Sequence, residues 1–193
     1  MQSETPAAQS SSPADLGTET QVPARHRAIA TRAKDALFSQ LSNRLMSAMQ
    51  SDGPAAAIEV CRTEAKQISS SVGEEYCVEI GRTSFKLRSA ENEPRDWVRP
   101  FVEDRTDTPR FVTLKDGQTG AVFPIRMGVK CLMCHGQDED IIDEVKPALA
   151  KLYPSDRATG FRLDELRGWF WVEVPGTVDQ PAVDSVENAD DDS

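Results

Sequence analysis

The residues best suited to chemistry in this chain lie at positions 131–135, which read Cys-Leu-Met-Cys-His. The chain has only four cysteines and two histidines, so chance would produce this pattern in on the order of one in a thousand such sequences. Two cysteines three positions apart lie on neighbouring turns of a short helix, where both sulfurs can form thioethers with the two vinyl groups of one porphyrin. The histidine that follows, His135, can then ligate the iron. The pattern predicts the attachment of one covalently bound haem c, through Cys131 and Cys134.

Two other uses of a Cys-x-x-Cys pair are open. A structural zinc site needs two further ligands, and the other cysteines, Cys61 and Cys77, lie far upstream and sixteen positions apart. A thioredoxin-like redox pair opens a helix after a strand of a βαβ unit, and residues 127–130 do not indicate that setting. The spacing favours haem over both.

The composition indicates one domain with two tails. The chain has 193 residues, 38% of them apolar, which is enough for one substantial core. We predict a disordered tail or tether at 1–24, one domain at 25–175 and an acidic disordered tail at 176–193. The net charge of −10 comes mostly from the tails, which hold acidic residues and no basic ones. The domain is nearly neutral and shows no concentrated basic face, which argues against nucleic acid as a partner.

The chain contains no apolar run of about 18 residues, so we expect no membrane-spanning helix. Its first residues also lack the basic and apolar regions of a signal peptide. Because covalent haem attachment normally follows export, we expect a periplasmic or otherwise exported mature chain whose leader has been replaced by Met1. The Ser, Pro and Ala-rich stretch from Thr5 to Pro13 suits a flexible tether, including a lipid-anchored one.

Two helices are predicted ahead of the motif. Apolar residues recur at every fourth position over 25–50, which indicates a long amphipathic helix: Ile29, Ala33, Leu37, Leu41, Leu45 and Met49. After a break at 51–54, a second apolar stripe indicates a second helix: Ala57, Ile58, Cys61, Ala65 and Ile68. Cys61 is therefore expected to face inward.

Alternating and β-branched segments predict a small antiparallel sheet of four or five strands. They are 76–82, a hairpin of 111–114 and 120–127 that leads into the haem motif, and 168–174. Short helices are expected from Pro94 to Val102 and over 141–152, despite Pro147. The predicted fold class is α+β, with two N-terminal helices and helices packed on one face of the sheet.

Four stretches of the sequence occur in an order that is more specific than the haem motif alone. They are 56–61 with Ala65, 81–88 with Asn92 and Trp97, 131–136, and 153–156 leading through Ala158 and Gly160 to Arg167-Gly168. This order resembles the single-haem c-type cytochrome family with a PAS-like fold, whose domain occurs alone or as the sensory part of signalling proteins. The resemblance runs from about residue 28 to residue 175. The chain departs from the family pattern at Ser89-Ala90, where Asn-Pro is usual, and at Val98, where an acidic residue is usual.

The resemblance implies that Cys61 is the second axial ligand, opposite His135. The residues permit this independently, because coordination to iron deprotonates a thiol and Cys61 lies on an apolar stripe. A small buried hydrophobe is the alternative role for this residue. Cys77 has no counterpart in the family pattern and is interpreted as structural, with a disulfide to Cys61 as the lesser alternative.

Other residues that could ligate the iron in place of Cys61 rank below it. Met127 is the best methionine alternative to Cys61, whereas Met46 and Met49 are interpreted as packing residues. His26, beside the predicted tail, is expected to be solvated. Separately, Arg82 and Arg88 are predicted to pair with the haem propionates, since guanidinium groups bind carboxylates bidentately; a solvated strand edge is the alternative.

An iron with two protein ligands has no free position for a substrate. We therefore expect one-electron transfer with a redox partner protein and no enzymatic catalysis, at a potential that the thiolate lowers relative to a His/Met cytochrome. The alternative is a redox or diatomic-gas sensor that acts through a separate partner, if the bond to Cys61 breaks on reduction. A peroxidase-like enzyme would need a distal histidine, and His26 is the only one besides His135.

Overall fold

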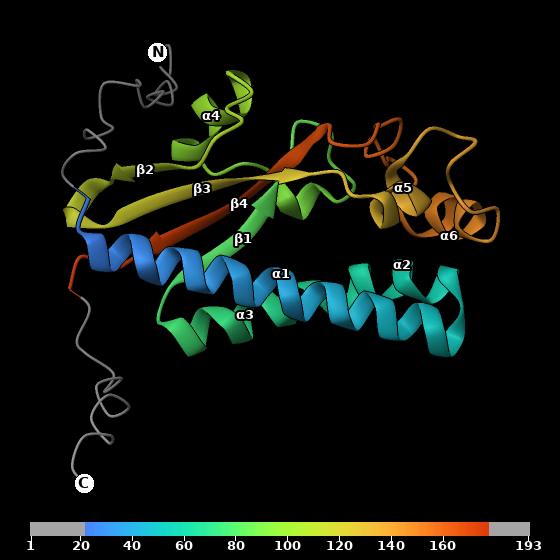
Figure 1. Ribbon diagram of the computed structural model, residues 1–193, viewed down its shortest axis with the longest axis horizontal. Coiled ribbons are helices and arrows are strands. Elements are labelled where there is room, and N and C mark those ends of the chain that lie inside the picture. The colour runs from blue at the N-terminus through green and yellow to red at the C-terminus, as the bar shows by residue number, and fades with distance from the viewer. Residues whose placement is uncertain (1–21, 178–193) are drawn as a thin grey trace, which may run out of the picture.

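A four-stranded antiparallel sheet in the order β1-β4-β3-β2 forms the centre of the computed structural model, which describes residues 22–177 (Figure 1). The strands are β1 (Glu79–Thr83), β2 (Arg110–Thr113), β3 (Thr119–Arg126) and β4 (Leu166–Val174). The long strands β3 and β4 pair with each other, and the register is irregular between Ile125 and Arg126. The predicted tails lie almost wholly outside the described residues.

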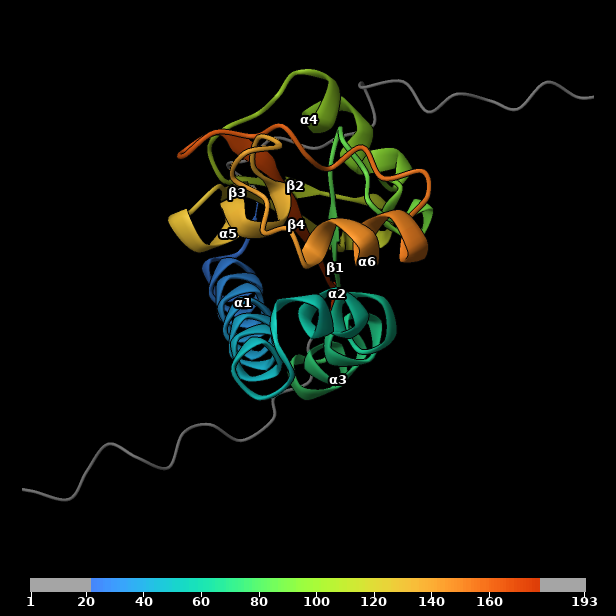
Figure 2. The same cartoon turned by 90° about the vertical axis from the view of Figure 1, so that its right-hand side faces the viewer.

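Helices cover both faces of the sheet and one of its ends. One face of the sheet is covered by α1 (Ala24–Asp52) and α3 (Ala65–Tyr76), and the other by α4 (Arg99–Glu103) (Figure 1). Beyond one end of the sheet lie α5 (Val129–His135) and α6 (Val145–Leu152). These two helices lie across from α2 (Pro54–Thr63) (Figure 2). Short 3-10 turns complete the chain at η3 (Ala90–Asn92), η4 (Asp96–Val98) and η5 (Lys115–Gly117). None of the helices within 22–177 combines the length and apolar character of a membrane span. The predicted α+β class and the small antiparallel sheet are confirmed.

Alternation along the central strands explains why both faces are covered. In β4, Phe170 and Val172 join the core under α1 and α3, whereas Trp169, which precedes Phe170, packs with Val98 and Val122 on the opposite face. Successive side chains of a strand point to opposite faces, so the unbroken apolar run at 169–172 needs cover on both sides. The expectation of helices on one face alone was therefore incomplete.

The second predicted helix is two helices, α2 and α3, which meet at Glu64. The backbone of Glu64 departs from helical geometry, with φ of −107°, and its carboxylate accepts hydrogen bonds of 2.7 and 2.6 Å from Arg44 of α1. The apolar stripe continues across this bend because the spacing of Cys61, Ala65 and Ile68 is nearly that of an unbroken helix. Periodicity alone could not reveal the bend.

The last predicted helix is shorter than its apolar stripe. α6 begins at Val145, and Ile141 precedes it in a turn, although both pack with Ile58 of α2 in one buried cluster. Pro147 occupies the third position of α6, where the first-turn N–H has no partner within the helix in any case. Proline is therefore tolerated there.

His26 was expected to be solvated, and that expectation is wrong. α1 begins at Ala24, which brings the His26 side chain against β3, where it is only 4% exposed. Its Nδ1 lies 2.9 Å from Thr119 Oγ1. Burial, with a smaller contribution from the positive charge of Arg25, lowers the pKa of His26. The first turn of the longest helix is thus fixed to the sheet by a neutral imidazole.

We expect His26→Ala to lower the free energy of unfolding by about 1–2 kcal/mol at pH 7, because the substitution removes a buried hydrogen bond and its packing. A lowered folded-state pKa means that the unfolded chain binds the proton first, so wild-type stability should fall as the pH drops through about 6.5. Urea unfolding at pH 7 and pH 5 measures both effects. Because His135 is present in both proteins, its contribution cancels, and an equal pH dependence in both would contradict the assignment.

Candidate functional site

A cavity of about 1270 Å³ lies between the helices α1 and α2, the end of the sheet, and α5. Pockets for small ligands usually measure roughly 300–1,000 Å³, so this one has room for a large cofactor. All six residues that the sequence singled out line it: Cys61, Arg82, Arg88, Cys131, Cys134 and His135. The fold therefore brings α2, β1, the loop after β1 and α5 around one space.

The cavity has an apolar wall made by the helices. Among the side chains that line it are Leu41, Leu45, Met46, Met49, Ile58, Met127 and Met133. Met46 and Met49, which were interpreted as packing residues, are half-buried at the cavity edge, whereas Met127 is almost fully buried at the end of β3. This mixture of apolar lining and a few convergent polar groups is typical of cofactor sites.

Helix α5 carries both motif cysteines and His135 within seven residues. Cys131 is exposed, Cys134 is half-buried, and both are free thiols. Burial raises the pKa of Cys134 to about 11, against the opposing positive charge of Arg88. At neutral pH the sulfur of Cys134 is therefore a thiol, and both cysteines of this short helix line the same cavity.

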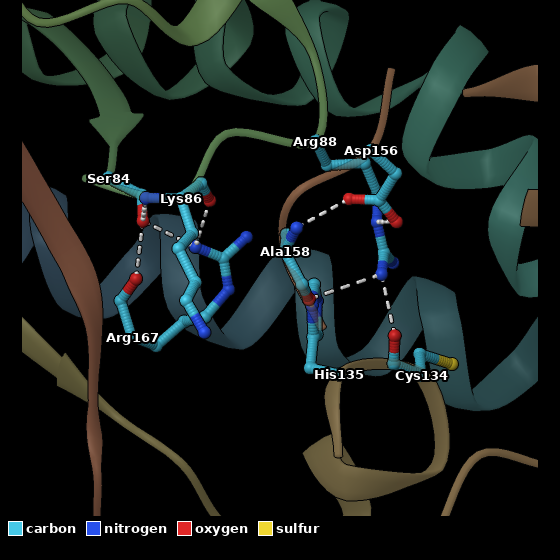
Figure 3. A network of polar contacts seen from close by, with 8 residues as sticks. All are labelled: Ser84, Lys86, Arg88, Cys134, His135, Asp156, Ala158 and Arg167. Atoms are coloured by element: carbon cyan, nitrogen blue, oxygen red, sulfur yellow. Dashed lines mark hydrogen bonds and ion pairs between the residues drawn. The ribbon is translucent and has the colours of Figure 1, made fainter. Parts of the chain in front are cut away.

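The imidazole of His135 is oriented by a backbone carbonyl. Its Nδ1 lies 2.6 Å from the oxygen of Ala158, and since a carbonyl can only accept, Nδ1 carries the hydrogen (Figure 3). Burial, followed by the positive charges of Arg88 and Arg167, lowers the pKa of His135 well below its usual value. The ring is therefore neutral and Nε2 keeps its lone pair, which is the arrangement that metal-ligating histidines show.

The C-terminal end of α5 is held by contacts with distant segments. The carbonyls at the end of a helix lack partners within it. Here the Cys134 oxygen accepts from Arg88 Nη2 at 2.6 Å, the His135 oxygen from the Phe161 N–H at 3.1 Å, and the Gly136 oxygen from the Gly160 N–H at 2.7 Å. Gly136 itself leaves no room for a side chain, because a Cβ there would lie 2.7 Å from the Leu132 oxygen and 2.6 Å from the Asp140 Cβ. Residues 158–161 thus form the support of the helix.

Arg88 is the centre of this support. Its Nε donates to Asp156 at 2.9 Å, and the two side chains are only 8% and 9% exposed. The other oxygen of Asp156 accepts from the Ala158 N–H at 2.7 Å, so the same carboxylate also fixes the residue that orients His135 (Figure 3). Arg88 is therefore no solvated strand edge, and its engaged nitrogens give it a positioning role. Asp156 was not singled out from the sequence, where its only signal was its place in the 153–156 stretch.

Cys61 reaches the cavity from α2, the helix that lies across from α5 and α6 (Figure 2). Burial raises the pKa of its thiol, while the positive charges of Arg82, Arg88 and Arg167 act in the opposite direction. Cys77 lies elsewhere, exposed at the end of α3 with a left-handed backbone, and both cysteines are free thiols, so no disulfide joins them. Among residues 22–177, no three His, Cys, Asp or Glu side chains are grouped to hold a metal ion by themselves.

Arg167, at the start of β4, is a cavity residue to which sequence reasoning assigned no role. Its Nη1 donates to Ser84 Oγ at 2.7 Å and to the Lys86 oxygen at 3.1 Å. Arg82 also lines the cavity, from β1, and its guanidinium group makes no hydrogen bond or salt bridge within the part of the chain that the structure describes. The cavity wall therefore presents two guanidinium groups with no carboxylate partner.

Comparison with known proteins identifies one family and one fold. A family model described as Tll0287-like matches residues 13–175. The crystal structure of the cyanobacterial haem protein Tll0287 aligns with a TM-score of 0.53 at 21% sequence identity, covering 75% of this chain and 93% of that one. No curated protein matches the chain.

We expect Arg88→Gln to lower the free energy of unfolding by about 3–5 kcal/mol, because it leaves Asp156 as a buried, unpaired charge. Arg99→Gln is the matched control: its partner Asp96 is on the surface, with side chains 51% and 81% exposed, and its loss should cost at most about 0.5 kcal/mol. Chemical unfolding of the three proteins at pH 7 provides the comparison. Similar losses in the two variants would contradict the positioning role of Arg88.

Proposed function

The chain belongs to the Tll0287-like family, and on that premise we propose that it is a monohaem c-type cytochrome that transfers single electrons. The observation that carries this proposal is the meeting of four residues at one large cavity: Cys131, Cys134 and His135 from α5, and Cys61 from α2. A haem protein, Tll0287, has the same fold, which supports haem as the occupant. When bound, the haem would supply an iron that takes up and releases one electron.

Cys131 and Cys134 are the proposed points of attachment. Each thiol would hold one vinyl group of the haem through a thioether, an addition that conserves all atoms and would need no external oxidant. Their spacing on the seven-residue helix α5 matches the two vinyl groups of a single porphyrin. Because attachment of this kind normally follows export, we propose that the protein is matured outside the cytoplasm.

His135 and Cys61 are the residues proposed to hold the haem iron. His135 is neutral and held by the Ala158 carbonyl, so Nε2 can bind iron without first losing a proton. Cys61 must lose its proton, and iron coordination itself drives that loss. The positive charges of the nearby arginines also favour the thiolate. An iron held by both side chains would leave no position for a substrate, which supports electron exchange with a redox partner protein and argues against an enzyme.

Covalent attachment can be tested directly in protein matured in an exporting bacterial host. We expect the haem to stay with the wild-type polypeptide in acidified organic solvent and to be lost when Cys131 and Cys134 are both replaced by serine. Cys77→Ser is the matched control, because that thiol is exposed and lies away from the cavity, and it should retain the haem. Haem that extracts freely from the wild-type protein would refute the proposal.

Ligation by Cys61 predicts a low-spin His/thiolate spectrum for the ferric protein. Cys61→Ala should abolish the thiolate features, whereas Cys77→Ser should leave them unchanged; an unchanged spectrum in Cys61→Ala would exclude this ligand.

Binding of carbon monoxide by the reduced protein distinguishes an electron carrier from a sensor. An electron carrier should be reduced and reoxidised without binding it, while binding by the reduced wild-type protein would favour a gas sensor that acts through a separate partner.

A further inference from the structure

Arg167 has hydrogen-bonding capacity that the protein does not use. Its Nη1 is engaged by Ser84 and Lys86, but its Nε is fully buried and has no hydrogen-bond partner within residues 22–177. A buried donor without an acceptor costs about 1–3 kcal/mol, and more when the group is charged. Natural proteins rarely leave such a donor empty unless a ligand supplies the acceptor.

The same wall of the cavity carries an excess of positive charge. Of the half-buried guanidinium groups in the lining, those of Arg88 and Arg95 are paired with carboxylates, whereas those of Arg82 and Arg167 are not. The guanidinium group of Arg82 has no hydrogen-bond or salt-bridge partner in the described part of the chain. Burial, and then the positive charges of Arg88 and Arg82, lower the pKa of Arg167 to about 10. An anion placed here would relieve both the missing hydrogen bond and the repulsion.

Other charged groups at the cavity do not fill this need. Glu91 and Glu93 line it but are exposed, and Glu79 pairs with Arg95. The remaining cationic residues of the lining are exposed as well and add positive charge: Arg62, Lys66, Arg126 and Lys130. The chain itself therefore brings no free carboxylate to Arg167 within the residues described.

We infer that Arg167, together with Arg82, binds a propionate carboxylate of the haem, while Arg88 only positions α5. This inference rests on the proposed function, since a haem brings two carboxylates into the cavity. A guanidinium group matches a carboxylate with parallel N–H donors, and the free Nε of Arg167 is one such donor. The sequence predicted that Arg82 and Arg88 bind the propionates. We assign Arg167 in place of Arg88, because Arg88 already forms an ion pair with Asp156.

The inference has an electrochemical consequence. A positive charge held close to the haem favours the reduced iron, which carries one positive charge less than the oxidised iron. Arg167→Gln removes the charge and should lower the midpoint potential of the holoprotein, changing the equilibrium constant of reduction about tenfold, or 59 mV for one electron. Arg167→Lys keeps the charge but not the planar fork, so its potential should stay near the wild-type value.

Redox titration followed by visible absorption measures the potential, and infrared difference spectra between the two oxidation states report the carboxylate bands. Both arginine variants should shift the carboxylate bands. Ser84→Ala is the matched control, since it removes a neighbour of Arg167 without removing charge, and it should change neither measurement appreciably.

An Arg167→Gln holoprotein with unchanged potential and unchanged carboxylate bands would overturn the inference, although its covalent haem would leave the proposed function intact. A fall in potential of the same size in Ser84→Ala would also overturn it, because the cause would then be lost packing. If Arg167→Gln does not fold, unchanged carboxylate bands in Arg167→Lys decide against the inference. Wild-type protein without covalent haem would refute the proposed function and, with it, the inference.

Discussion

The site depends on the buried ion pair between Arg88 and Asp156. One guanidinium group and one carboxylate, both shielded from water, join the loop after β1, the end of α5 and the segment that precedes β4. Burying two charges is costly unless further hydrogen bonds satisfy them, and here the Cys134 carbonyl and the Ala158 N–H do so. The pair thereby places the carbonyl that orients His135, so this electrostatic contact determines how the imidazole is presented to the cavity.

This support matters because α5 is short. A helix of seven residues gains too little from its own hydrogen bonds to persist in isolation. The carbonyls at its C-terminal end accept hydrogen bonds from the segment around Gly160 and from Arg88. Its first residue, Val129, follows shortly after the end of β3, one of the two long central strands. The cysteines and histidine of the motif are therefore held on a rigid element whose stability comes from the tertiary structure.

The cavity wall formed by α1 and α2 differs from the wall formed by the strands in being mostly apolar. α1 and α2 supply mostly apolar side chains and the thiol of Cys61, while the polar groups gather on the strands and on the loop after β1. A flat cofactor with an apolar ring system and charged carboxylates has the same division. The large volume and the unpartnered guanidinium groups of Arg82 and Arg167 together support our proposal that such a group binds at this end of the domain.

Much of this protein could be predicted from local patterns. The Cys131 to His135 spacing, the stripe of α1 and the alternation of the strands depend on residues close together in the chain, and they indicated the α+β class and the motif at a strand end. The bend at Glu64, the burial of His26 and the shortened α6 were missed, because a periodic stripe continues smoothly across a bend and says nothing of what lies opposite.

The different contacts of the three arginines at the cavity were decided by tertiary structure alone. The three arginines have the same chemistry. Asp156, 68 residues from Arg88, forms an ion pair with Arg88, which therefore positions α5, whereas Arg82 and Arg167 have no carboxylate partner. Local sequence determines which side chains are available, whereas long-range packing determines which of their charges are already neutralised.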